Sequence, residues 1–519
     1  MRRPLRRRAL AVCLAVLATT LTACSGGEGH RTLRVLASPE LADVKPLLKE
    51  LKDDTGVELD IDFKATADLT GPLGPYDLAW PATDRSYLLR LREERRRVPE
   101  STAIMRSPVV VGLTPAVAAE LPQGKPLTWA DIADAAADGT VRFGMADPRR
   151  SDTGRAALVG VATAAAGTGG VLRQRDVSCD RLRGFRSGQT LTGGSSRELI
   201  DAYVRRQGAA NALIAHESEL LSLNASRKLK QPLRIVHPAD GMVLSDFPLL
   251  LLDPKEHKAY RKVVEWLRRD DVQEKLTRAT WRRPVGSDVP RPRQLREPIG
   301  NALSYPDQLA VIQRLMDDYG DPARGRRGGD HVVFLLDFST SMRGERMAGL
   351  RSAFEGLSGA DPSARGKFAR FYRGERLTVV RFAGRVLEER TVTVAGDRDL
   401  RRLNDFVAGG GFGDGTAVWS ALDRGYRVAS DAERADPGRR RSIVLMTDGE
   451  NNTGMSYGEF GRRYARLDDG ARAVPTFPVH FGEADAGELR RAADATGGRV
   501  VDAGSSSLSQ AFKEIRGCR

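Results

Sequence analysis

The sequence predicts an α/β protein made of two sheet-forming blocks. Between residues 31 and 284, and again between 329 and 519, short apolar runs alternate with amphipathic stretches of helical period. The segment 285–328 between them is punctuated by Pro and Gly at both ends, which predicts a linker, and it contains one short helical pattern at 305–320. Apolar residues make up 41% of the 519 residues, which excludes a chain that is disordered throughout.

Strand and helix patterns alternate along the first block. Runs that are apolar or alternate with period two predict strands, and apolar residues every three or four positions predict helices. The expected strands are 32–38, 57–63, 76–80 and 141–145, with one or two more in 241–253; helices are expected at 41–56 and 258–281, and a strand followed by a helix at 107–121 and 212–221. This order predicts a parallel or mixed sheet covered by helices.

The second block repeats the alternation, starting from the fully apolar run "VVFLL". The expected strands are 331–336, 376–382, 385–394 at a sheet edge, 442–446, 474–481 and 499–502, and the expected helices are 342–357, 416–430, 458–467, 486–496 and 508–516. A doubly wound sheet of this kind places its ligand sites at the carboxyl ends of the strands.

The first 23 residues are expected to direct export. Five arginines precede an apolar stretch at 9–21 that is too short to span a bilayer. The stretch ends in "LTAC", which resembles a bacterial lipobox. The resemblance implies that Cys24 carries a lipid and anchors the protein to the outer face of the cytoplasmic membrane, with 24–30 as a flexible tether. An ordinary signal peptide with an incidental Cys24 is the alternative.

Parts of the first block resemble type II extracellular solute-binding proteins, which serve ABC importers. The resemblance is carried by "SPVVVGLTP" (107–115), "GMADPRRSDTGRAAL" (144–158) and the final helix. In that family two α/β lobes, joined by two crossing strands, close on a ligand. The resemblance implies a two-lobed periplasmic-binding-protein type II-like domain at 31–284.

Candidate ligand-binding residues in the first block lie next to predicted element boundaries. Ser38 follows the first strand, and Ser151, Asp152 and Thr153 precede a helix. Hydroxyls and backbone N–H groups in such positions suit an anion. The alternative is that these residues only cap helices.

Polar side chains also follow the predicted strands of the second block. Asp337 ends the strand 331–336, and Ser339 and Ser341 follow at alternate positions; Thr416 opens a helix behind a Gly-rich loop, and Asp448 comes just past the strand 442–446. Because the carboxyl ends of parallel strands share one sheet edge, we expect the five side chains to gather there. Their oxygens suit a hard divalent cation, Mg²⁺ or else Mn²⁺ or Ca²⁺.

The constellation "DFSTS", "GT" and "TDG" resembles the metal-ion-dependent adhesion site of von Willebrand factor A domains. The resemblance implies that Ser339 and Ser341 bind the metal directly, and that Asp337, Thr416 and Asp448 bind it directly or through water. It further implies a doubly wound, Rossmann-like domain at 329–519, and an open coordination position that a partner's carboxylate fills.

Two cysteines are left after Cys13 leaves with the signal and Cys24 takes a lipid. Cys179 and Cys518 would then lie in an oxidising compartment, where a disulfide between them is expected to tie the end of the chain to the first block. Two free thiols are the alternative. No Cys/His cluster with zinc spacing occurs in the sequence.

The net charge and the motifs of the sequence limit the classes of function that we expect. The formal net charge is +14, but five of these charges belong to the export signal, so the remaining excess is mild and we expect no nucleic-acid partner. No Ser/His/Asp order, phosphate loop or nucleophile elbow is present, which argues against an enzyme. The sequence therefore predicts a membrane-anchored extracytoplasmic binding or adaptor lipoprotein. It would bind a protein or cell-wall partner through the metal and a small ligand through the first domain. The alternative is a solute receptor of an ABC importer with the C-terminal domain as a docking accessory.

Overall fold

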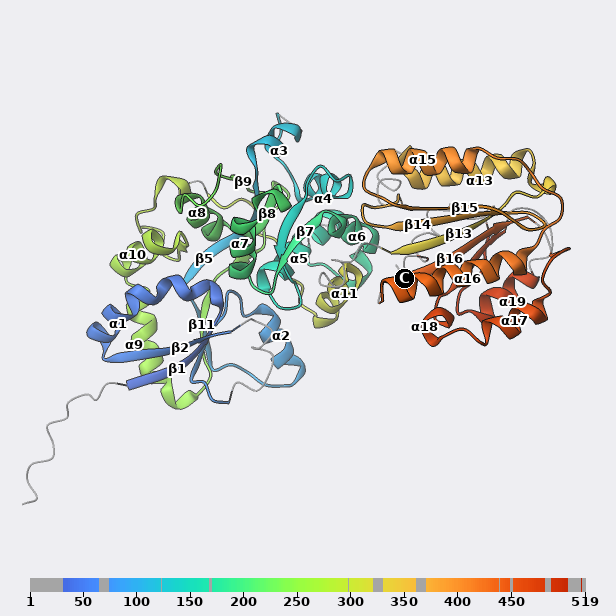
Figure 1. Cartoon of the computed structure of the whole chain (residues 1–519). Helices are drawn as coiled ribbons and strands as arrows, with labels where there is room; N and C mark the ends of the chain where they lie inside the picture. The colour runs from blue at the N-terminus through green and yellow to red at the C-terminus, as the bar shows by residue number, and fades with distance from the viewer. Residues whose placement is uncertain are drawn as a thin grey trace, which may run out of the picture.

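A computed structural model describes residues 31–64, 74–122, 124–167, 170–296, 298–320, 330–360, 370–437, 439–448, 451–480, 487–502 and 515. The two predicted blocks form separate α/β units, and the first unit is divided into two lobes (Figure 1). The predicted signal, tether and Cys24 lie outside the described residues. Within the described ranges, none of the helices combines the length and apolarity needed to cross a bilayer.

Lobe 1 is built on a five-stranded sheet of order β2-β1-β3-β11-β4. Its strands are β1 (Arg31–Ala37), β2 (Val57–Phe63), β3 (Leu78–Trp80), β4 (Glu100–Ala103) and β11 (Pro248–Leu251), and its helices are η1 (Pro39–Leu47), α1 (Leu48–Thr55), α2 (Arg85–Glu93), η5 (Pro254–Glu256), α9 (His257–Leu267) and α10 (Asp270–Thr280). β1 pairs in parallel with β2 and β3, and β11 runs antiparallel to β3 and β4. Apolar side chains from β1, η1, α9 and α10 form the lobe's core.

The single helix predicted over 258–281 is in fact two helices. α9 and α10 are separated at Arg269, whose backbone is extended (φ −61°, ψ 141°). Asp270 and Asp271 occupy the first turn of α10, where acidic side chains stabilise a helix N-terminus. The Arg269 guanidinium also donates to Asp271 at 2.8 and 3.0 Å. This cluster of charges starts a new helix while the apolar faces of both helices stay in the core.

Lobe 2 carries a seven-stranded sheet of order β10-β5-β8-β6-β7, with β9 and β12 also paired to β5. Its strands are β5 (Met105–Leu113), β6 (Phe143–Ala146), β7 (Gln189–Gly193), β8 (Ala212–His216), β9 (Arg234–Val236), β10 (Leu244–Ser245) and β12 (Arg283–Pro284). Its helices are α3 (Pro115–Glu120), α4 (Trp129–Ala137), α5 (Asp152–Ala166), α6 (Cys179–Ser187), α7 (Ser196–Arg205), α8 (Glu217–Ala225) and α11 (Leu309–Tyr319), with the short turns η3 (Gln174–Asp176), η4 (Gln207–Ala209) and η6 (Arg293–Leu295).

Two strand connections cross between the lobes, which confirms the predicted two-lobed fold. β4 passes into β5 through Ile104, and β10 passes into β11 through Asp246 and Phe247. The apolar run 241–253 therefore splits into two strands, one in each lobe's sheet.

The segment 285–328, which we expected to be a linker, contributes a helix to lobe 2. Val311, Ile312, Leu315 and Tyr319 of α11 are buried in the same hydrophobic cluster as α4 and α5. The sequence predicted a helix within 305–320, and the structure has one. The sequence did not indicate that the apolar face of this helix packs into lobe 2.

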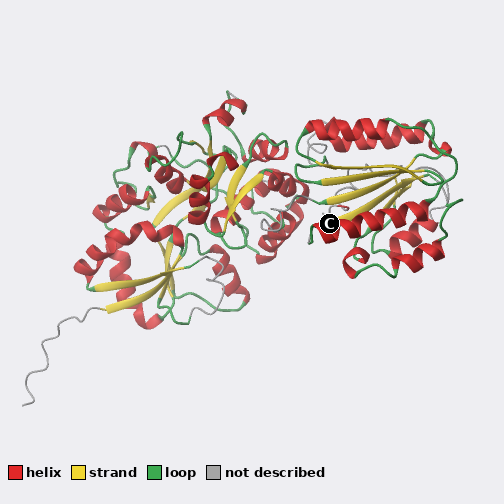
Figure 2. Cartoon of the chain, in the orientation of Figure 1, coloured by secondary structure: helices red, strands yellow, loops and turns green. Residues whose placement is uncertain are grey.

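The C-terminal unit has a six-stranded sheet of order β15-β14-β13-β16-β17-β18, with helices on both faces (Figure 2). Its strands are β13 (His331–Asp337), β14 (Arg376–Phe382), β15 (Val386–Thr393), β16 (Arg441–Thr447), β17 (Thr476–His480) and β18 (Val501–Asp502). Its helices are η7 (Thr340–Met342), α13 (Glu345–Glu355), η8 (Gly356–Ala360), α15 (Asp397–Ala408), α16 (Val418–Ala435), α17 (Tyr457–Tyr464), α18 (Asp469–Arg472) and α19 (Gly487–Ala495).

β15 is the edge strand that the sequence predicts. It runs antiparallel to β14, and the other strand pairs are parallel. α13 and α15 cover one face of the sheet, and α16, α17 and α19 cover the other (Figure 1). The sequence reading missed α15, although Leu400, Leu403, Phe406 and Val407 follow a helical period and are buried. The helix expected at 508–516 lies outside the described residues, apart from Ile515.

The two units touch where α6 of lobe 2 meets the N-terminal ends of β13 and β14. Arg183 of α6 lies 3.5 Å from Asp330, which also pairs with Arg440 at 2.8 Å. The Tyr372 hydroxyl donates to the Asp180 carbonyl at 3.3 Å. The carboxyl ends of the same strands, where the metal site is predicted, lie at the opposite edge of the sheet.

Candidate functional site

The predicted metal-site residues come together at the carboxyl ends of β13 and β16. These two strands are central in the sheet and pair in parallel, with Leu336 opposite Met446. Every residue of both strands is buried, which explains their unbroken apolar runs. Parallel pairing therefore delivers Asp337 and Asp448 to one edge of the sheet.

Hydrogen bonds join four of the five predicted residues. The Ser339 N–H donates to Asp337 Oδ1 at 2.8 Å, the hydroxyls of Ser339 and Ser341 lie 2.9 Å apart, and the Ser341 hydroxyl donates to Asp448 Oδ1 at 3.1 Å. Asp337, Ser339 and Asp448 are at most 4% exposed, whereas Ser341 is exposed. The site therefore opens to solvent at Ser341.

The fifth residue, Thr416, is held at the same edge by the backbone of its loop. Gly413 forms a bridge with Ser339, and Gly415 has a φ of +71°, a conformation that favours glycine. The Thr416 N–H donates to the Asn452 side chain at 2.8 Å, and the Asn452 N–H donates to the Thr416 carbonyl at 3.0 Å. In the described part of the chain, the buried Thr416 hydroxyl bonds none of the other four side chains. Asn452, which follows Asp448 closely, is a positioning residue that the sequence reading missed.

The two carboxylates of the site have different surroundings. Burial raises the pKa of Asp337, and the nearby charge of Asp448 adds to this, while hydrogen bonds from Thr447 and Ser339 oppose it. Among the described residues no basic side chain bonds Asp337. Asp448 is paired through Oδ2 with Arg346, whose side chain is 45% exposed. Among the described residues, Asp448 therefore has a basic partner, whereas Asp337 has none.

This donor set fits a hard divalent cation. All the side-chain donors are oxygens, and the buried Asp337 carboxylate needs positive charge nearby. Across the residues that the structure describes, no group of three or more His, Cys, Asp or Glu side chains is placed to hold a metal. A cation bound at this edge would therefore need hydroxyl ligands in addition to the two carboxylates.

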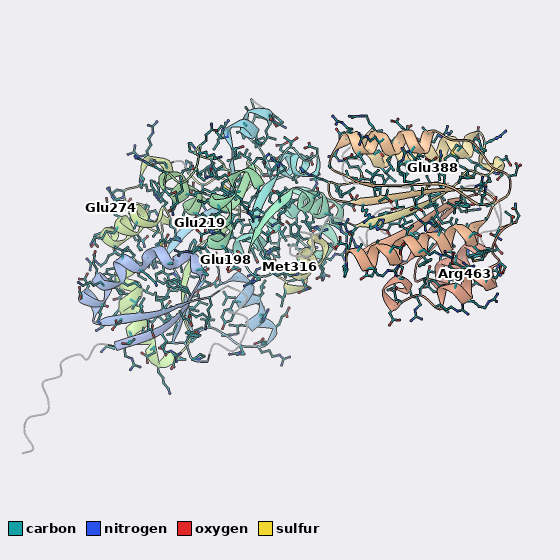
Figure 3. All side chains as sticks on the ribbon, in the orientation of Figure 1. Glu198, Glu219, Glu274, Met316, Glu388 and Arg463 are labelled. Atoms are coloured by element: carbon teal, nitrogen blue, oxygen red, sulfur yellow. The ribbon has the colours of Figure 1, made fainter. Side chains whose placement is uncertain are left out.

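A second polar group, which we call the interlobe cluster, consists of Ser38, Glu40, Thr153, His216 and Glu219. Ser38 directly follows β1 in lobe 1, and its hydroxyl donates to Glu40. In lobe 2, His216 Nδ1 lies 3.3 Å from the Thr153 hydroxyl and 3.2 Å from Glu219. Burial, and then the charge of Glu219, raise the pKa of Glu40. Glu219 lies near the boundary between the lobes (Figure 3), so the cluster draws side chains from both.

The predicted ligand-binding residues do not act as helix caps through their side chains. Ser38 and Ser151 stand at the N-cap positions of η1 and α5, but neither side chain bonds the helix backbone. The Ser151 hydroxyl is buried and makes no hydrogen bond within the described ranges. Asp152 pairs with Arg155 through one oxygen, and its other oxygen is likewise unbonded there.

His216, Glu217 and Glu219 were missed by the sequence reading although a signal existed. The segment "ALIAHESE" places one titratable side chain at the last position of the buried strand β8 and two more directly after it. The same signal, polar residues after a buried strand, identified Asp337. Glu40 had no comparable signal, because its role depends on the approach of lobe 2.

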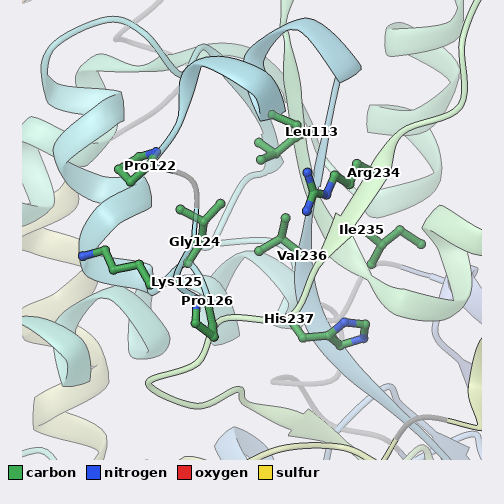
Figure 4. Close-up of a pocket in the computed structure, with 11 residues that line it drawn as sticks. Leu113, Pro122, Gly124, Lys125, Pro126, Arg234, Ile235, Val236 and His237 are labelled. Carbon is green, nitrogen blue, oxygen red and sulfur yellow. The ribbon is translucent and has the colours of Figure 1, made fainter.

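A separate cavity of about 210 Å³ opens at the end of β5, between the segment 122–127 and β9 (Figure 4). Leu113, Pro126 and Val236 form apolar walls, and Lys125 and Arg234 add positive charge. The cavity shares no lining residue with the interlobe cluster. Nor does it share one with the predicted metal site, which we call the metal edge and which consists of Asp337, Ser339, Ser341, Thr416 and Asp448.

Cys179, the first residue of α6, is disulfide-bonded. Its predicted partner, Cys518, lies outside the described residues, so the pairing of these two cysteines stays a prediction.

Two family models match the chain. Residues 33–282 match the model of the bacterial extracellular solute-binding protein, and residues 331–514 match the model of the von Willebrand factor type A domain. A search of curated proteins finds no match.

Several solved structures of binding proteins are similar to the first unit. A ferric binding protein from Campylobacter jejuni is 15% identical, with 55% of this chain and 98% of that chain covered and a TM-score of 0.42. The periplasmic binding protein AfuA from Actinobacillus pleuropneumoniae is 12% identical, with 56% and 97% covered and a TM-score of 0.43. A periplasmic thiamin binding protein is 12% identical, with 56% and 96% covered and a TM-score of 0.45. The fold and the two family models together show a chain that joins a segment of the solute-binding type to a segment of the von Willebrand factor A type.

Proposed function

We propose that this protein is an extracytoplasmic binding or adaptor lipoprotein that engages a partner through a divalent cation at the metal edge. The observation that carries the proposal is the hydrogen-bonded set Asp337, Ser339, Ser341 and Asp448 at the ends of two central strands, with Thr416 beside it. Von Willebrand factor A domains commonly bind divalent metals with such residues. A bound cation would supply positive charge that attracts an outside carboxylate.

The chain's own residues define how such a partner approaches. Asp337 and Ser339 are buried and hold the inner side of the site, and Ser341 is exposed at its mouth. A partner's carboxylate, on a protein or a cell-wall component, therefore reaches the site from the side of Ser341. Within the described ranges, no His or Lys side chain bonds the Ser339 or Ser341 hydroxyl as a base would, so we infer binding rather than catalysis.

The test uses the full chain as bait on extracts of the cell surface. A partner should be retained in Mg²⁺ and released by EDTA, and Asp337→Ala and Asp448→Ala should both lose it. A partner that stays bound in EDTA and on both variants would disprove a metal-dependent interface.

Membrane anchoring is the second part of the proposal. It rests on "LTAC" and on the match of residues 33–282 to an extracellular family. Cys24→Ala should release the protein into the medium, whereas Cys13→Ala, which lies within the signal, should not. Retention of the Cys24 variant in the membrane fraction would argue against a lipid anchor.

The interlobe cluster supports a second candidate function, a small-ligand receptor of an ABC importer. Ser38 and Ser151 sit at helix starts without capping them, and the Ser151 hydroxyl is unbonded within the described ranges. Glu40 lies close enough to Glu219 for the charge of Glu219 to raise its pKa, in addition to the effect of burial, so the space between the lobes is lined by two carboxyl groups as well as by hydroxyls. Tight binding of a small solute that Ser151→Ala weakens would favour this function.

A further inference from the structure

Arg346 pairs with one of the two carboxylates of the metal edge. Its Nη1 atom bonds Asp448 Oδ2, and it also donates to the Ser341 carbonyl at 3.3 Å. Asp448 uses its other oxygen, Oδ1, to accept from the Ser341 hydroxyl. The guanidinium thus lies on the solvent side of the same carboxylate that a cation would use.

The position of Arg346 is not explained by helix stability. It stands in the first turn of α13, where the helix dipole disfavours positive side chains, and the N-cap Gly344 has no side chain to compensate. Nor does packing explain it, because the side chain is 45% exposed. The bond to Asp448 is the contact that accounts for this conformation.

We propose, on the basis of the metal site proposed above, that Arg346 is a built-in competitor of the divalent cation for Asp448. A cation at this edge needs the negative charge that the guanidinium now neutralises, and the two positive charges repel each other at short range. Metal binding therefore requires that Arg346 leave Asp448. Once released, the guanidinium lies beside the mouth of the site, where it is available to an acidic group on the partner.

A second arginine offers a matched control. Arg343 is two residues from Ser341 and is exposed, but its guanidinium lies over the Phe412 ring, 5.1 Å from the centroid, and has no bond to Asp448. Removing Arg343 changes the net charge by the same amount as removing Arg346. Of these two arginines, Arg346 is the one bonded to a carboxylate of the metal edge.

The experiment measures Mg²⁺ binding alone, by isothermal titration calorimetry on the full chain. Arg346→Gln should bind Mg²⁺ roughly three- to tenfold more tightly than wild type, because a half-exposed ion pair no longer has to break and the repulsion is gone. Arg343→Gln should change the affinity less than about twofold, since an exposed charge without a bond to the site is screened by solvent. Arg346→Lys, which keeps the charge, should stay close to wild type.

The outcomes separate this inference from the function on which it rests. Binding of Mg²⁺ by wild type, together with loss of binding in Asp337→Asn, would support the metal site. If wild type binds Mg²⁺ but Arg346→Gln binds it equally or more weakly, the proposed competition is wrong while the metal site stands. If Arg343→Gln gains as much affinity as Arg346→Gln, the effect comes from net charge and not from the bond to Asp448, and the proposed competition is again wrong. Wild type that binds no Mg²⁺ would defeat the site and the inference together.

Discussion

Asp337→Asn is the substitution that separates metal binding from folding most cleanly. In the wild type, Oδ1 accepts from the Ser339 N–H at 2.8 Å and Oδ2 accepts from the Thr447 hydroxyl at 2.6 Å. An amide retains the first bond through its oxygen and donates to the Thr447 oxygen through its nitrogen. Because it also removes a buried charge, the variant should be at least as stable as wild type when EDTA is present.

Mg²⁺ should then stabilise the two proteins to different extents. At 100 times the dissociation constant, a ligand that binds only the folded state stabilises it by about 2.7 kcal/mol. For a unit of this size, that corresponds to a rise of about 5–10 °C in the melting temperature. Loss of an outer partner of a metal ligand typically costs about 10- to 100-fold in affinity, so loss of a ligand should cost more than about 100-fold. At the same Mg²⁺ concentration the variant should gain less than about 0.4 kcal/mol.

Differential scanning calorimetry of the full chain, with and without Mg²⁺, measures both quantities. The transition of the C-terminal unit is the one that Mg²⁺ should shift in wild type. Asp405→Asn is the matched control, because Asp405 is exposed on α15 and the same change there should leave the Mg²⁺ shift intact. A Mg²⁺ shift in Asp337→Asn equal to that of wild type would refute the assignment of Asp337 as a metal ligand.

Three further predictions concern the rest of the molecule. Burial lowers the pKa of His331 to about 3, while in the unfolded chain it is near 6.5. The unfolded state therefore binds the extra proton, so the free energy of unfolding should fall by about 1.4 kcal/mol per pH unit below pH 6.5. Urea titrations between pH 5 and 7 should show a shallower pH slope for His331→Gln, and equal slopes would contradict the lowered pKa of His331 in the folded protein. Arg283→Gln removes the guanidinium that lies 2.7 Å from the buried Glu217 carboxylate, which keeps its contact with His237 at 2.7 Å. The change should cost about 3 kcal/mol in chemical denaturation, and a loss below about 1 kcal/mol would show that the pair is not needed. Tyr372→Phe removes the hydrogen bond to the Asp180 carbonyl and should speed amide hydrogen exchange in α6. Unchanged exchange would show that this contact does not hold the two units together.

Local patterns in the sequence were sufficient to predict most strands and to predict that Asp337 and Asp448 lie at the same end of the sheet. A strand that is buried on both faces favours apolar residues at successive positions, so the middle of β13 (332–336) and of β16 (443–446) is visible as an unbroken apolar run. Polar residues directly after such strands must lie at the sheet edge, which is why Asp337 and Asp448 were predicted as a pair. The amphipathic period also predicted α11, although not the core into which it packs.

What the sequence by itself determined is therefore the set of elements and the residues that end them. The tertiary structure decided which of those residues meet. Arg346 and Asp448 are 102 positions apart, and the approach of Glu40 to Glu219 depends on how the two lobes close. No local pattern encodes such contacts, because they arise only when the packing of whole elements brings distant side chains within reach of one another.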